Sequence, residues 1–90
     1  MIHQIDRSSF NIPPPEQPAT ATRELKWYAT GDDAVLGVVI LDVASETYAW
    51  AVLTEKVRGQ GFAAIATRTE LATEEAAAAA LPTAMRFTHG

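Results

Sequence analysis

The sequence predicts an α+β fold in which an antiparallel four-stranded meander is followed by one alanine-rich C-terminal helix packed on one face of the sheet. From Leu25 onward, β-branched and aromatic runs alternate with short polar segments, a pattern typical of strands joined by tight turns. From Thr73 the pattern changes, and residues 76–80 are five consecutive alanines, which have the highest helix propensity. Ninety residues suit a single domain.

Residues 1–22 are predicted to form a Pro-rich N-terminal arm, extended or disordered, and residues 23–90 a single α+β domain. Four of the five prolines lie between Pro13 and Pro18. Each proline lacks an amide donor and pushes the preceding residue toward extended geometry, so this stretch cannot join a helix or a central strand. The arm also carries Ile5, Phe10 and Ile12, which gives it enough apolar surface to dock on the domain.

The four strands are expected at residues 25–30, 34–43, 48–55 and 62–68. Their connections are short and contain Gly, Asp, Ser or Glu, which are residues that favour turns. Because connections of this length join only antiparallel neighbours, the strands are expected to follow one another across a single sheet.

The helix is expected to begin after Thr73, whose hydroxyl can accept a hydrogen bond from a free amide of the first turn. Glu74 and Glu75 place negative charge at the positive end of the helix dipole. Pro82 lacks an amide and clashes with the preceding turn, so the regular helix is expected to end or kink near Leu81. Residues 83–87 could then form a further turn.

The hairpin between the second and third strands determines which side chains share a face. Pairing of Val43 with Tyr48 places Leu36, Val38, Ile40, Ala49, Ala51 and Leu53 on one face. It places Val35, Gly37, Val39, Leu41, Tyr48, Trp50 and Val52 on the other, with Arg68 from the fourth strand. The alanine-rich helix is expected to cover the first, small-residue face, because its alanines would allow a close approach of the backbones. Gly37 is expected to leave room for the Trp50 indole.

An aromatic face without a helix over it needs another cover, because one layer cannot bury both faces of a sheet. The predicted interaction face consists of Val39, Leu41, Tyr48, Trp50, Val52 and Arg68. Its cover could be the N-terminal arm, a second copy of the chain or another protein. The preferred hypothesis is therefore a non-catalytic protein-interaction module, self-associating as a homodimer through this face or a sheet edge. One alternative is a small ligand bound between the arm and the sheet.

Chemistry-bearing motifs are absent from the sequence. The chain has no cysteine, and His3 and His89 lie near its two ends, where a fixed catalytic pose is difficult to maintain. We expect no catalytic, cofactor-binding or metal-binding residues, and no cofactor. Seven basic against eleven acidic residues give a net charge of −4, which disfavours a nucleic-acid partner. No apolar run approaches the length of a membrane span, and the lack of cysteine agrees with a cytoplasmic location.

Two resemblances bear on the fold. A sheet followed by a helix that opens with Thr73-Glu74-Glu75-Ala76-Ala77 resembles the DNA-binding domains of ethylene-response factors and the arm-binding domains of phage integrases. This resemblance implies a nucleic-acid-binding module that reads DNA from its exposed sheet face. The runs Lys26-Trp27-Tyr28-Ala29, Leu36-Gly37-Val38-Val39 and Trp50-Ala51-Val52-Leu53 are similar to small bacterial proteins of unassigned function, a resemblance that implies no activity.

Overall fold

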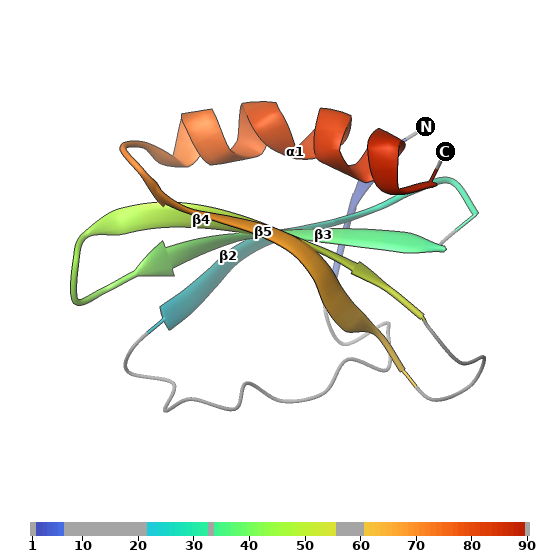
Figure 1. The fold of residues 1–90 in the computed structure, drawn as a ribbon, viewed down its shortest axis with the longest axis horizontal. Helices are drawn as coiled ribbons and strands as arrows, with labels where there is room; N and C mark the ends of the chain where they lie inside the picture. The colour runs from blue at the N-terminus through green and yellow to red at the C-terminus, as the bar shows by residue number, and fades with distance from the viewer. Residues whose placement is uncertain (1, 7–21, 33, 56–60, 90) are drawn as a thin grey trace.

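The structure, a computed structural model, describes residues 2–6, 22–32, 34–55 and 61–89. These residues form one open antiparallel sheet and a C-terminal helix, so the predicted α+β class is confirmed. The elements are β1 (His3–Ile5), β2 (Thr22–Ala29), β3 (Val35–Asp42), β4 (Thr47–Thr54), β5 (Ala63–Leu71) and α1 (Glu74–His89). The strands follow one another across the sheet in chain order, and α1 lies along one face of it (Figure 1).

The sheet has five strands within the described residues, one more than predicted. The additional strand, β1, lies inside the segment predicted as an arm and pairs antiparallel with β2, with His3 opposite Ala29 and Ile5 opposite Trp27. The start of the chain is therefore part of the sheet. The Pro-rich remainder of the predicted arm, residues 7–21, lies outside the described residues.

The hairpin between β3 and β4 closes on an aspartate side chain. Asp42 accepts a hydrogen bond from the amide of Ala44 at 3.1 Å, a local interaction that favours a turn over continued strand. The resulting register pairs Tyr48 with Leu41, not with Val43 as predicted. This difference is two residues, and side chains alternate with a period of two, so the predicted division of β3 and β4 into two faces is unchanged.

Helix α1 covers the face of Val39 and Trp50, so the predicted placement on the alanine-containing face is wrong. Its inward side consists of Ala77, Leu81 and Met85, which form a buried cluster with side chains from β3 and β4. The prediction matched the many alanines of the helix to the small residues of the sheet. The inward surface of α1 instead carries large side chains at i and i+4 spacing. These side chains need a position in the sheet where no side chain projects toward the helix.

Gly37 provides that position. A methyl group placed on Gly37 would lie 2.7 Å from Met85 Sδ and 3.0 Å from both terminal carbons of Leu81. At these distances, any side chain at this position would force Met85 and Leu81 to shift. Gly37 therefore makes room for the helix and not, as predicted, for the Trp50 indole.

The helix begins as predicted and extends further than predicted. The Thr73 hydroxyl accepts a hydrogen bond from the amide of Ala76 at 3.0 Å, which confirms the N-terminal cap. Pro82 lies inside the helix and does not end it. Leu81 and Met85, on either side of the proline, are both buried against the sheet, so tertiary packing holds the last turns despite the lost hydrogen bond.

Two bulges interrupt the pairing of β5 with β4. Arg68 pairs with Trp50 and Leu71 with Tyr48, so two residues of β5, Thr69 and Glu70, lie opposite one residue of β4. Glu70 has a φ of 61°, a left-handed conformation that relieves the extra length.

The second bulge lies near the start of β5. Ala64 pairs with Leu53 and Ala66 with Val52, which leaves Ile65 as the extra residue. The extra residue shifts the preceding part of the chain by one position, and Phe62 consequently packs in the cluster on the face away from α1.

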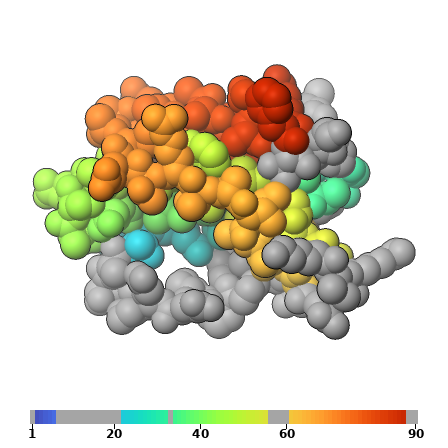
Figure 2. Space-filling model, viewed as in Figure 1, coloured from blue at the N-terminus to red at the C-terminus, as the bar shows by residue number. Residues whose placement is uncertain are grey.

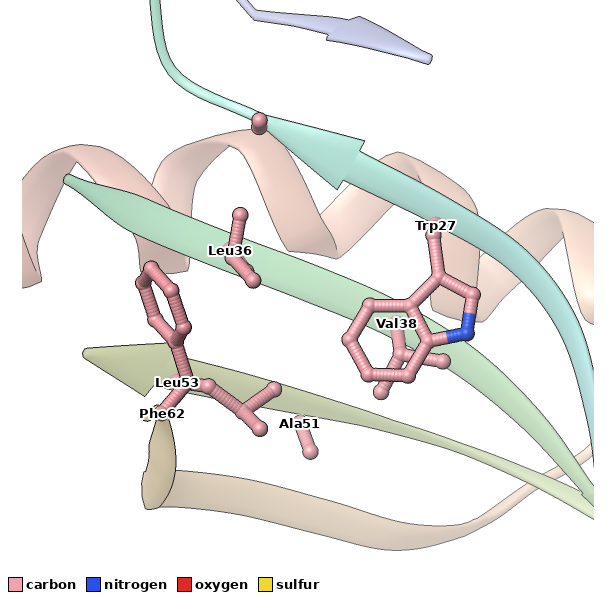
Figure 3. Packing of buried hydrophobic residues seen from close by; sticks show 7 residues of the cluster. Trp27, Leu36, Val38, Ala51, Leu53 and Phe62 are labelled. Atoms are coloured by element: carbon pink, nitrogen blue, oxygen red, sulfur yellow. The ribbon is translucent and has the colours of Figure 1, made fainter. Parts of the chain in front are cut away.

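A second apolar cluster lies on the side of the sheet that faces away from α1, as Figure 3 shows. It contains Trp27, Ala29, Leu36, Val38, Ala51, Leu53 and Phe62, all buried. Trp27 Nε1 donates a hydrogen bond to Glu24 Oε1 at 3.2 Å. Both faces of the central strands therefore contain buried apolar residues, as the sequence indicates.

Candidate interaction surface

The predicted interaction face is assembled as expected but is partly covered by the protein's own helix. Register pairs Val39 with Trp50, Leu41 with Tyr48 and Trp50 with Arg68, so these side chains share one face. Val39 and Val52 have no exposed surface, because α1 lies over them. Val39 and Val52 are consequently not available to a partner, whereas Leu41, Tyr48 and Trp50 are partly exposed and Arg68 is exposed.

The arm, through Ile5, Phe10 and Ile12, was one of three possible covers for Trp50. Ile5 instead packs against the cluster around Trp27 on the opposite face. Phe10 and Ile12 lie outside the described residues. Among the described residues of this segment, Ile2 packs on the Trp50 side, so the start of the chain contributes to both clusters.

The sheet edge formed by β5 is long but irregular. Its nine residues are exposed or partly exposed, and an edge of this length offers unpaired backbone groups to another strand. The two bulges and the charged side chains of Arg68 and Glu70 interrupt it, and both features are typical of edges that resist pairing. The edge is therefore a weaker candidate surface than its length indicates.

The outward surface of α1 presents the most exposed large hydrophobic side chain among the described residues. Phe87 is 82% exposed, against 44% for Val43 and 43% for Ile65. The helix forms the upper surface of the molecule in Figure 2. A large aromatic side chain at this exposure loses favourable burial, which a contact with another molecule would restore.

The surroundings of Phe87 are small side chains with one charge at each end. Ala76, Ala79 and Thr83 are exposed on the same side of α1. Glu75 in the first turn and Arg86 in the last turn are also exposed, and their separation of eleven residues, about three helical turns, aligns them along the helix. We refer to Glu75, Ala76, Ala79, Thr83, Arg86 and Phe87 as the outer α1 surface.

The face away from α1 has a charge that opposes nucleic-acid binding. In the domains that the sequence resembles, this is the face that reads DNA. Here it carries the carboxylates of Glu24 and Asp42, and Trp27 is buried. Carboxylates repel phosphates and do not release counterions from DNA, so the described residues do not support this alternative.

Within the described part of the chain, no three His, Asp or Glu side chains gather in a way that could hold a metal ion. The side chain of His89 lies outside the described residues. Helix α1 is too short and too polar to cross a membrane. A comparison of the chain with protein-family models, with curated proteins and with solved structures finds no match. Any functional proposal therefore depends on the residues described above.

Proposed function

We propose that this chain is a non-catalytic protein-interaction module that forms a homodimer through the outer α1 surface. The observation that carries the proposal is the 82% exposure of Phe87 on the outward side of a helix. The chain contains no cysteine, which fits the proposal that the protein works in the cytoplasm.

An antiparallel arrangement of two α1 helices makes this surface complementary to itself. When Phe87 lies opposite Ala76 of a second copy, Ala79 lies near Thr83 of that copy, and small residues at the centre allow the helices to approach closely. The same arrangement repeats twice about a twofold axis, as a closed homodimer requires. Each large aromatic side chain would then fill the space above a small one.

The charges favour the same orientation. In the antiparallel pair, Glu75 lies near Arg86 of the second copy, and this ion pair also occurs twice. A parallel pair would instead place Glu75 beside Glu75 and Arg86 beside Arg86. The opposed helix dipoles add a further favourable term in the antiparallel pair. Like charges in contact disfavour the parallel alternative, so electrostatics selects one orientation.

Sedimentation equilibrium of the whole chain tests this proposal. A contact made by one helix from each copy is at the small end of specific interfaces, so we expect a dissociation constant on the order of tens of micromolar. Phe87→Ser should raise this constant at least about tenfold. Ile65→Ser, which alters an exposed apolar residue of the β5 edge, is the matched control and should leave the constant unchanged.

The two substitutions also distinguish a homodimer formed through the outer α1 surface from one formed through the β5 edge. If Ile65→Ser dissociates the dimer and Phe87→Ser does not, the sheet edge is the interface and the proposal for α1 is wrong. A chain that remains monomeric at several hundred micromolar would exclude self-association through either surface.

A further inference from the structure

A hollow lined by hydroxyl groups lies on the face of the sheet away from α1, beside the β3–β4 hairpin. Its volume is about 370 Å³, which is within the range of small-molecule sites. Four strands and the hairpin contribute to its wall, which consists of Thr22, Ile40, Asp42, Ser45, Thr47, Ala49, Thr67, Thr69 and Glu70. Five of these nine residues carry a hydroxyl group, and Ile40 and Ala49 supply apolar surface. We refer to it as the hydroxyl hollow.

Some of the polar groups in the hydroxyl hollow are already used by the fold. The Thr67 hydroxyl donates a hydrogen bond to the carbonyl of Trp50 at 2.9 Å. The hydroxyls of Ser45 and Thr47 lie 2.7 Å apart and bond to each other. These interactions fix the shape of the wall and leave other groups to meet a ligand.

Other oxygen atoms that line the hydroxyl hollow make no hydrogen bond to any described residue. Asp42 uses Oδ1 for the amides of Ala44 and Ser45, and its second carboxylate oxygen has no such partner. The Glu70 carboxylate and the Thr69 hydroxyl likewise bond to none of the described residues. Available acceptors therefore come from both sides of the hollow.

The charge of the hollow is negative. Asp42 and Glu70 line it, whereas no Lys, Arg or His does. Asp42 is on β3 and Glu70 on β5, with β4 between them, so the two backbones lie about 10 Å apart at the usual strand spacing. Hydrogen bonds of about 3 Å at each end leave space between the carboxylates for a short aliphatic chain.

We propose that the hydroxyl hollow binds a small aliphatic diamine. One ammonium group donates to Asp42 and the other to Glu70, because each is a triple donor without acceptor capacity. The methylene groups between them lie over Ile40 and Ala49. The hydroxyls of Thr22 and Thr69 accept the remaining ammonium protons. This site is separate from the outer α1 surface and does not depend on homodimer formation.

Nuclear magnetic resonance of the whole chain tests the proposal, with 1,4-diaminobutane as the probe. We expect saturable shifts of the backbone amides around the hollow, and no shifts with 1,4-butanediol, which has the same length without charge. Both carboxylates are at least partly exposed, so loss of one should weaken binding about fivefold. Glu70→Gln should show this loss. Glu55→Gln, which removes an exposed carboxylate just after β4 and outside the hollow, should not.

The same titration identifies the results that would overturn the site. Shifts that increase without saturation, or that spread over all surface carboxylates, would mean ordinary charge screening. Equal shifts with the diol would exclude recognition of the ammonium groups. If Glu70→Gln alters the spectrum of the free protein, Thr69→Val provides a second test, and unchanged binding in both variants would contradict the proposal. Phe87→Ser should retain binding, which separates this result from the test of the homodimer.

Discussion

Replacing Gly37 with alanine should destabilise the protein, although the added group is a single methyl. The new methyl would lie 2.7 Å from Met85 Sδ and 3.0 Å from both terminal carbons of Leu81. These distances are well below ordinary van der Waals contact of about 3.5–4.0 Å between carbon atoms. The Met85 thioether can rotate away because it is the flexible end of a side chain. Leu81 is branched and buried, so its side chain has little space into which to shift.

The magnitude follows from two opposing terms. Overpacking of a core by a methyl group costs about 1–3 kcal/mol. Alanine has less backbone freedom than glycine in the unfolded chain, which returns about 0.4–1 kcal/mol at a compatible position. The net loss should therefore be about 1–2 kcal/mol in the free energy of unfolding. For a domain of this size, that corresponds to a decrease in Tm of several degrees.

Urea unfolding followed by circular dichroism measures this loss. Gly31→Ala is the matched control, because Gly31 is exposed in the turn between β2 and β3 and the substitution should change stability by less than about 0.5 kcal/mol. Met85→Ala removes the closest atom. In the double variant with Gly37→Ala, the loss should be smaller than the sum of the single losses by about 1 kcal/mol. Neutral Gly37→Ala, or strictly additive losses, would refute the close contact between β3 and α1.

Substitutions at three further positions test the packing of Trp50 and the stability of α1. Trp50 Nε1 is buried without a hydrogen-bond partner among the described residues. Trp50→Phe should therefore lower the free energy of unfolding in urea by less than about 1 kcal/mol, whereas Trp50→Ala should lower it by about 3–5 kcal/mol. A loss for Trp50→Phe as large as that for Trp50→Ala would show that the indole nitrogen makes a hydrogen bond. Thr73→Ala removes the bond to the Ala76 amide and should cost about 1 kcal/mol, and an unchanged Tm would exclude a stabilising cap. Pro82→Ala restores an amide donor for the carbonyl of Ala78, so it should stabilise the protein by about 1–3 kcal/mol. A decrease in stability would mean that the proline ring contributes more through packing.

The division of the central hairpin into two faces could be predicted from sequence because it depends on alternation alone. The predicted pairing of Val43 with Tyr48 was wrong by two residues, yet residues 35–41 and 48–53 were all assigned to the correct face. The cap at Thr73 was predictable for a similar reason, since it involves a hydroxyl and an amide three residues apart. Local rules are sufficient for features of this kind.

The side on which α1 packs could not be predicted in the same way. The prediction compared average side-chain size, whereas the packing depends on Leu81 and Met85 meeting the single glycine of β3. That contact joins residues more than forty positions apart, and no local pattern indicates it. As a result, α1 buries Val39 and Val52 of the predicted interaction face.

Strand β1 and the bulges were missed because they depend on partners distant in the sequence. His3–Ile5 has only three residues, too few to show a period of two. The extra residues of β5, Ile65 and Glu70, have no turn chemistry of their own, since neither is Gly, Asn or Asp. Their positions become visible only when β5 is aligned with β4, and they place Glu70 in the wall of the hydroxyl hollow.

A distance measured between two copies of the chain tests the proposed homodimer most directly. The chain contains no cysteine, so Ala72→Cys introduces a single site for a nitroxide label on an exposed residue just before α1. In the antiparallel pair, the two labelled positions lie at opposite ends of the helices, about 30 Å apart at 1.5 Å per residue and the usual interhelical distance. Double electron–electron resonance should therefore give a distribution centred near this value, which Phe87→Ser abolishes. A distance below about 15 Å would indicate parallel helices, and a distribution unaffected by Phe87→Ser would contradict the α1 interface.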